Sequence, residues 1–143
     1  MAATKSGFAG VRSRSLAVRG GIAVVLSMVA NAVVLVVAQA LEIAPEFQAL
    51  TFPPVLFLSA AGAVGAVAVY WVFDRRVDRP ARTFRRIAIA VLVVSFVPDL
   101  ALLGLDEAAT VPGVVVLMLM HVVVAAVAVG VLVGWSGEEQ GTR

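Results

Sequence analysis

The chain has 143 residues, enough for one compact unit and too few for two domains. Hydrophobic residues make up 62% of it and charged residues 14%, whereas soluble domains average roughly 45–50% apolar and roughly 25% charged. With no cysteine, one histidine and a net charge of only +2, the chain offers no disulfide, iron–sulfur or multi-histidine metal site and no case for nucleic-acid binding. The composition predicts a membrane protein without a cofactor, in which the lipid bilayer solvates part of the chain.

Four apolar stretches are long enough to cross about 30 Å of hydrocarbon as helices, which takes about 20 residues each. They are predicted at residues 20–40, 52–73, 87–105 and 111–135. A basic segment, residues 1–19, precedes this transmembrane domain (residues 20–135), and a polar tail, residues 136–143, follows it. Because the stretches are continuously apolar, they favour helices over barrel strands, which are shorter and alternate polar with apolar residues.

The connections between the stretches predict the topology. All 11 Lys and Arg residues lie before the first stretch, between the second and third, or at the end of the tail. The two opposite connections contain only acidic charges, Glu42, Glu46, Asp106 and Glu107. Short links place sequential helices antiparallel, and basic residues mark the cytoplasmic side. We therefore expect an all-α, up-down-up-down four-helix bundle in the cell membrane, with the N- and C-termini in the cytoplasm.

The first stretch has an alternative interpretation. A basic leader, an apolar run and Ala38-Gln39-Ala40 resemble a secretory signal peptide with its cleavage site. The run is longer than a usual signal-peptide core and contains Asn31. We expect the segment to be retained as a helix, and cleavage after Ala40 stays open.

Polar side chains within the predicted helices are the candidate site, because burying them in lipid is costly. Five are singled out at central-to-outer depths: Asn31, Ser59, Ser95, Asp99 and His121. Pro98 frees a backbone carbonyl beside Asp99, and histidine changes charge near neutral pH. One hypothesis is a proton- or ligand-linked site at Asp99 and His121. The alternative is that Pro98-Asp99 ends the third helix early, leaving Asp99 in outer water, while His121 and Asn31 bond to neighbouring helices.

Residues 74–86 form the most strongly basic connection. It contains six arginines, for which we predict contact with anionic lipid headgroups or an acidic partner: Arg75, Arg76, Arg79, Arg82, Arg85 and Arg86. The alternative is that they only determine the topology.

Small and aromatic residues of the second stretch also predict contacts. Ser59 with Ala63, and Gly62 with Ala66, are spaced four apart and allow close helix packing, within the bundle or in a homo-oligomer. The aromatic residues near its cytoplasmic end and at the end of the fourth stretch are expected at the membrane interface: Tyr70, Trp71 and Trp135.

Several elements of the sequence resemble one known family. They are Asn31, Pro53-Pro54, the run Arg82-Thr83-Phe84-Arg85-Arg86-Ile87-Ala88, Ser95 with Pro98, and the run from Met120-His121 to Val127. Together they resemble a family of small, uncharacterised four-helix membrane proteins of actinobacteria and haloarchaea, over residues 19–134. Phe84 departs from the tryptophan often found there. The resemblance implies a membrane protein and no catalytic role.

The sequence has no phosphate-binding loop, nucleophile elbow or paired catalytic carboxylates. We therefore expect a non-enzymatic structural or accessory membrane component, with a membrane-protein partner or a second copy of itself. The alternative is a small oligomeric transporter or channel subunit that uses Asp99 and His121.

Overall fold

The computed structural model of the protein describes residues 3–138, with side chains for residues 15–134. The elements are α1 (Ala3–Ala40), the 3-10 helix η1 (Gln48–Leu50), α2 (Phe52–Arg76), α3 (Pro80–Leu105) and α4 (Val111–Glu138). Between residues 3 and 138 there is no strand, so this part of the chain is all-α. Four helical segments are long and apolar enough to cross a membrane: Ser15–Ala40, Phe52–Arg76, Pro80–Leu105 and Val111–Gly134.

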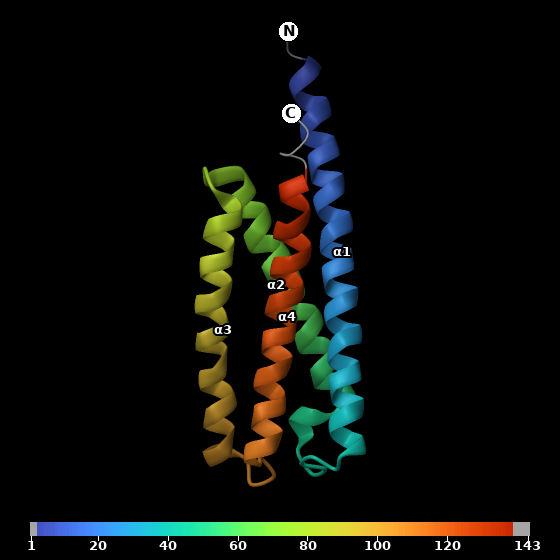
Figure 1. Cartoon of the computed structure of the whole chain (residues 1–143), viewed down its shortest axis with the longest axis vertical. Coiled ribbons are helices and arrows are strands. Elements are labelled where there is room, and N and C mark those ends of the chain that lie inside the picture. Colours follow the sequence, from blue (N-terminus) through green and yellow to red (C-terminus); the bar gives the residue numbers. More distant parts are fainter. Residues whose placement is uncertain (1–2, 139–143) are drawn as a thin grey trace.

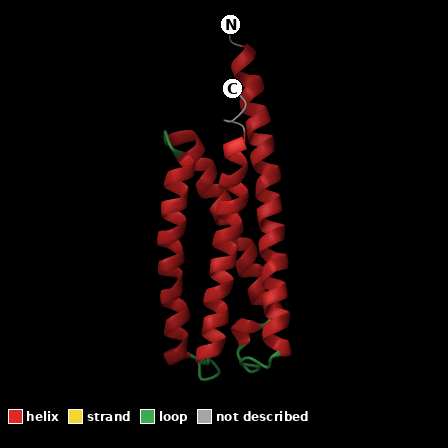
Figure 2. Ribbon diagram, in the orientation of Figure 1, coloured by secondary structure: helices red, strands yellow, loops and turns green. Residues whose placement is uncertain are grey.

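Consecutive helices run in opposite directions and lie alongside one another (Figure 1). The α2–α3 connection lies at the same end of the molecule as the start of α1 and the end of α4, and the other two connections lie at the opposite end (Figure 2). α4 contacts each of the other long helices, whereas α3 contacts α4 and α2 at the edge of the molecule. α2 also contacts each of the other long helices, so α2 and α4 together form the centre of the bundle.

Local sequence signals explain where the helices begin and end. Pro53 and Pro80 lie in the first turns of α2 and α3, where a missing backbone N–H costs no helical hydrogen bond. Arg75 and Arg76 occupy the last turn of α2, where positive charge interacts favourably with the helix dipole. Before α4, the Thr110 hydroxyl accepts a hydrogen bond from the Gly113 N–H at 3.2 Å and so caps the helix.

One core cluster lies at the end of the molecule that carries the 41–51 connection. We call it the Phe47 cluster; its buried residues are Leu35, Phe47, Leu50, Val55, Val114, Leu117 and Met120. The connection folds back under the helices, so that Phe47 is only 1% exposed. Glu42 and Ala44 have φ of 54° and 51°, and this left-handed backbone makes the reversal. The connection is therefore part of the packed structure.

A second core cluster lies toward the opposite end, the end that carries the α2–α3 connection. This Tyr70 cluster contains Leu16, Tyr70, Phe84, Ala128, Leu132 and Val133. The rings of Tyr70 and Phe84 meet edge to face, with centroids 5.2 Å apart and planes at 88°. This contact fixes the start of α3 against α2.

Most of the remaining apolar surface is uncovered. In α3 only Phe84 and Asp99 are buried, while Val94 and Val97 are 66% and 65% exposed. Water-soluble monomers rarely expose this much contiguous apolar surface. It is the expected surface of helices surrounded by lipid tails, which are as apolar as the side chains.

The structure corrects one expectation about the third helix. α3 continues through Pro98 to Leu105, so the alternative in which Pro98-Asp99 ends it early is wrong. Pro98 lies on the exposed side of the helix and Asp99 is buried. Neighbouring helices allow proline inside apolar helices, and here the contact of Asp99 with α4 lies directly after the proline.

Other expectations are extended or corrected. α1 begins at Ala3 within the basic segment, α2 and α3 extend into the arginine-rich connection, and α4 reaches Glu138 in the tail. Tyr70 is 3% exposed, so its side chain faces the core of the bundle. Trp71 is 42% exposed. The remaining expected interface and basic side chains lie outside the residues whose side chains are described: Trp135, Lys5, Arg12, Arg14 and Arg143.

Candidate functional site

Asn31 joins three helices. Its Nδ2 donates hydrogen bonds to Ser59 Oγ of α2 at 2.8 Å and to the Met120 carbonyl of α4 at 3.3 Å. Asn31 and Ser59 are 2% and 3% exposed. A buried amide with two donors is suited to this role, because both of its hydrogens find acceptors on other helices. Asn31 therefore connects α1 to α2 and α4. We call this contact of Asn31 with Ser59 and the Met120 carbonyl the first joint.

Ser59 continues the same chain of hydrogen bonds. Its hydroxyl accepts from Asn31 and donates to the Val55 carbonyl one turn earlier, at 2.6 Å. Two polar atoms of α1, Asn31 Oδ1 and Ser27 Oγ, are buried without a hydrogen-bond partner among the described residues. Ser27 lies four residues before Asn31, hence on the same face of α1. The α1 side of this joint therefore contains buried polar atoms whose hydrogen-bonding capacity is not fully used.

Asp99 and His121 form the second joint, between α3 and α4. Asp99 Oδ2 lies 3.0 Å from His121 Nδ1, and the two side chains are 8% and 39% exposed. Nδ1 also lies 2.9 Å from the Leu117 carbonyl of its own helix. Asp99 Oδ2 is within ion-pair distance but accepts no well-directed hydrogen bond from the described residues. Nδ1 therefore faces two competing acceptors.

This geometry permits two arrangements of the protons. If Nδ1 carries a hydrogen, the hydrogen can serve the Leu117 carbonyl or the Asp99 carboxylate but not both with good geometry. If Asp99 is protonated, its hydroxyl can donate to a bare Nδ1. Nε2 has no partner among the described residues, and the ring is partly exposed. The pair can therefore hold a proton and exchange it between Oδ2 and Nδ1.

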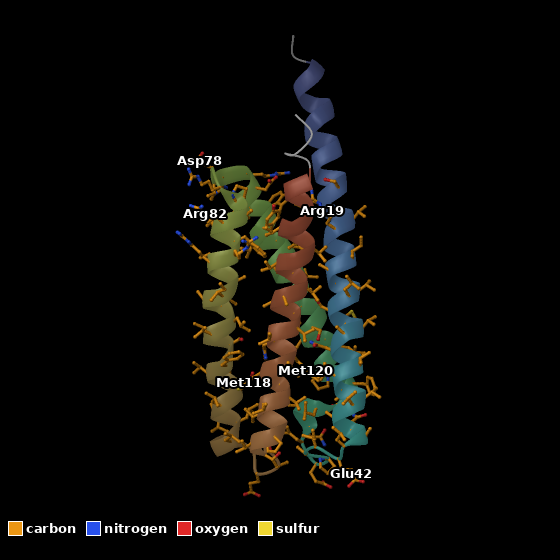
Figure 3. All side chains as sticks on the ribbon, in the orientation of Figure 1. Arg19, Glu42, Asp78, Arg82, Met118 and Met120 are labelled. Atoms are coloured by element: carbon orange, nitrogen blue, oxygen red, sulfur yellow. The ribbon has the colours of Figure 1, made fainter. Side chains whose placement is uncertain are left out.

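The two joints lie at one level of α4. Met120, whose carbonyl accepts from Asn31, directly precedes His121, which contacts Asp99. Figure 3 labels Met120 among the side chains between the helices. Four of the five expected polar residues thus form two pairs, Asn31 with Ser59 and Asp99 with His121. Ser95 does not join them, because its hydroxyl donates to the Leu92 carbonyl of its own helix at 2.7 Å.

Comparison with known proteins places the chain in a family. Residues 11–136, most of the chain, match the model of a family of unknown function, DUF6069. The chain belongs to DUF6069. No curated protein and no solved structure matches it. Membership supports the resemblance to an uncharacterised family and assigns no activity to the DUF6069 chain.

Sequence reasoning missed several groups at the joints of this DUF6069 chain. Ser27 is fully buried, and its spacing of four from Asn31 was a usable signal. The carbonyl groups of Met120 and Leu117 carry no sequence signal, because every residue has one. Which carbonyl accepts depends on how α4 is rotated against its neighbours.

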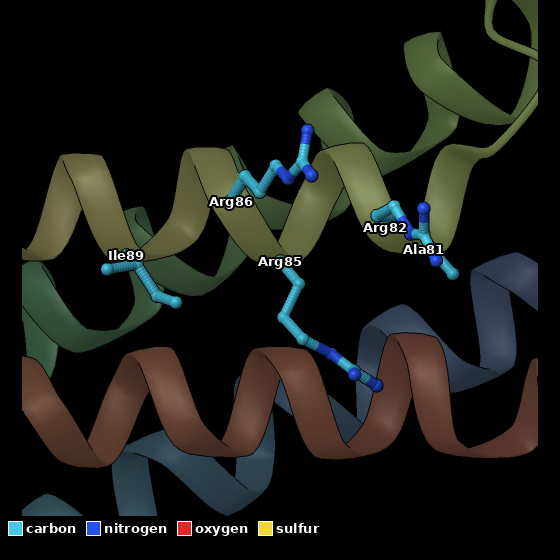
Figure 4. Close-up of a pocket in the computed structure, with 5 residues that line it drawn as sticks. All are labelled: Ala81, Arg82, Arg85, Arg86 and Ile89. Carbon is cyan, nitrogen blue, oxygen red and sulfur yellow. The ribbon is translucent and has the colours of Figure 1, made fainter.

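The six predicted lipid-contact arginines are all exposed, but their surroundings differ. Arg75 stacks over the Trp71 ring at 3.9 Å from its centroid, in a cation–π contact. Arg82, Arg85 and Arg86 line an open groove at the start of α3 together with Ala81 and Ile89 (Figure 4). Arg76 and Arg79 lie at the α2–α3 connection, outside this groove.

Proposed function

We propose that the protein is a multi-pass integral protein of the cell membrane, an up-down-up-down bundle with both termini in the cytoplasm. The distribution of charge supports this orientation. Arg19, Asp78 and Arg82 lie toward the end of the helices where the chain begins, and Glu42 lies at the opposite end (Figure 3). The connections at Glu42's end contain no Lys or Arg. Basic residues mark the cytoplasmic side.

The absence of native cysteine makes the orientation directly testable. Glu46→Cys and Asp78→Cys each introduce a single thiol, one in each type of connection. A membrane-impermeant maleimide applied to intact cells should label Glu46→Cys, whereas Asp78→Cys should react only after lysis. Labelling of Asp78→Cys but not of Glu46→Cys in intact cells would show the opposite orientation. Labelling of both variants in intact cells would exclude the four-span topology.

Within that topology, the function that the geometry supports best is a non-enzymatic structural or accessory component of the membrane. The observation that supports this proposal is that the polar side chains inside the apolar helices bind the helices to one another. Asn31 and Ser59 hold α1, α2 and α4 together, and Asp99 with His121 holds α3 to α4. The connections between the long helices, residues 41–51, 77–79 and 106–110, leave little chain outside them for a catalytic site.

Extraction from native membranes tests the accessory role. A tagged chain, expressed at its natural level and extracted with a mild detergent, should be recovered in a complex larger than one chain. Mass spectrometry should identify a reproducible second membrane protein or a second copy. A chain recovered repeatedly as a monomer without a partner would contradict the accessory role.

A second candidate function, a proton- or ligand-linked transporter or channel subunit, is favoured by one observation. Asp99 is a carboxyl group inside an apolar helix, and it faces a partly exposed histidine that can exchange a proton with it. Intramembrane ionisable residues commonly mark ion or substrate pathways. Proton flux into liposomes containing the purified chain is the test. Equal flux for wild type, Asp99→Asn and His121→Ala would refute the role of this pair.

A further inference from the structure

The first two turns of α3 concentrate positive charge without compensating negative charge. Arg82, Arg85 and Arg86 are exposed, and none has an acidic partner within residues 15–134. Like charges three and four residues apart destabilise a helix. Cations in the first turns also oppose the positive end of the helix dipole. A bound anion would relieve both effects.

The groove gives this charge a defined shape. Its lining comes from the first three turns of α3: Ala81, Arg82, Arg85, Arg86 and Ile89. Figure 4 shows Arg85 extending from α3 toward α4, with Arg86 directed to the other side of α3. Ile89 is the apolar lining residue and lies farther along α3 than the arginines (Figure 4). The groove therefore has a charged part at the start of α3 and an apolar part farther along the helix.

An exposed apolar track continues the groove along the helix. Ile89, Val93, Val97 and Leu100 are 59%, 60%, 65% and 52% exposed. Their spacing of four, four and three places them on one face, in line with Arg82 and Arg86. At 1.5 Å per residue the track is about 16 Å long, which is close to the roughly 15 Å depth of one leaflet of the hydrocarbon core.

We propose that this face of α3 binds an anionic phospholipid of the cytoplasmic leaflet. The phosphate would lie among Arg82, Arg85 and Arg86, because guanidinium groups bind phosphate oxygens in bidentate fashion. One acyl chain would follow Ile89 and Val93. The inference rests on the proposed membrane topology. It differs from a general attraction to acidic membranes in assigning the lipid to one groove, and the apolar track favours a lipid over a free phosphate.

The arginine-rich connection supplies a matched control. Arg75, Arg76 and Arg79 are equally exposed and lie at the same end of the molecule, but outside the groove. The triple variant R82Q/R85Q/R86Q removes the charges of the groove, and R75Q/R76Q/R79Q removes the same charge beside it. The exposed positions allow both variants to fold, which an unfolding titration of each verifies.

The experiment measures which lipids stay with the protein. Each variant is reconstituted into phosphatidylcholine bilayers with a minor share of phosphatidylglycerol and then extracted, and the retained lipids are quantified by mass spectrometry. Wild type and the control variant should retain phosphatidylglycerol above its bulk share. Because each arginine contributes about fivefold to anionic-lipid binding, the groove variant should lose enrichment by at least about tenfold.

Three outcomes would overturn the assignment. Equal losses in the two triple variants would show that overall charge alone attracts the lipid. Inorganic phosphate that competes for the site as strongly as added phosphatidylglycerol would show a soluble-anion site to which the acyl chain contributes nothing. Reconstituted wild type without any enrichment would refute the site while leaving the membrane topology intact. Failure of wild type to enter bilayers at all would instead refute the proposed membrane function, and the lipid site with it.

Discussion

Replacing Asn31 with alanine removes the donor that joins α1 to both α2 and α4. Asn31 Nδ2 lies 2.8 Å from Ser59 Oγ and 3.3 Å from the Met120 carbonyl. Ser59→Ala removes only the first of these contacts and leaves the second. A double-mutant cycle on Asn31→Ala and Ser59→Ala therefore isolates the energy of the side-chain pair from other effects of each substitution.

Hydrogen bonds between apolar helices in lipid contribute modestly. Measured couplings average about 0.6 kcal/mol and reach about 1.7 kcal/mol. Because the 2.8 Å contact is short and fully buried, we expect a coupling of about 1 kcal/mol. Asn31→Ala should lower the free energy of unfolding by about 1–2 kcal/mol, more than Ser59→Ala, since it loses two interhelical hydrogen bonds.

The assay is an unfolding titration with sodium dodecyl sulfate in mixed micelles, followed by circular dichroism. Ser95→Ala is the matched control, because among the described residues the Ser95 hydroxyl bonds to its own helix, at the Leu92 carbonyl. We expect it to change stability by less than about 0.5 kcal/mol. A coupling near zero for Asn31 and Ser59, or an Asn31→Ala variant as stable as Ser95→Ala, would refute the joint as a stabilising contact.

Four further predictions use the same titration. His121→Leu leaves Asp99 buried without a partner and should lower the free energy of unfolding by about 1–3 kcal/mol. Replacing both residues with leucine should lower it by less. A larger loss in the double variant would contradict a stabilising pair. Gly113→Ala should cost about 1–3 kcal/mol, because its Cβ would lie 2.9 Å from Ala44 Cβ. Gly130→Ala, with no atom within 4 Å, should be neutral or stabilising by up to about 1 kcal/mol. Phe47→Ala should cost about 3–5 kcal/mol if its burial in the connection is part of the packed core.

Length and hydropathy carried the prediction of four long apolar helices, because crossing a bilayer needs about 20 apolar residues in a row. The similar depth of Asp99 and His121, together with the chemistry of histidine, also predicts them as one of two alternatives for a site, and the structure places them 3.0 Å apart. Depth along a helix follows directly from residue number. The sequence therefore predicts the level at which a polar residue lies better than it predicts the side that it faces.

The facing sides could not be predicted. The helices are apolar all round, so no stripe of hydrophobic residues distinguishes the core from the lipid. The position of Tyr70 near the end of its stretch predicts an interface aromatic, and nothing in the sequence indicates that its ring packs on Phe84. Pro98 allows an early helix end as an alternative, because proline within a helix removes a backbone hydrogen bond and crowds the preceding turn. The contact that lies directly beyond it, from Asp99 to His121, is tertiary and has no local signal.

The sparse packing of α3 has a consequence for how the chain is made. Its two buried residues find their partners on other helices, Phe84 on Tyr70 of α2 and Asp99 on His121 of α4. Tyr70 precedes α3 in synthesis, but His121 follows it. Inserting a central aspartate in an isolated helix costs about 2.5–3.5 kcal/mol, so in a bilayer α3 would carry an unpartnered carboxyl group until α4 emerges from the ribosome. Completion of α4 is then the step that secures α3, and a chain truncated before His121 would display Asp99 to the lipid.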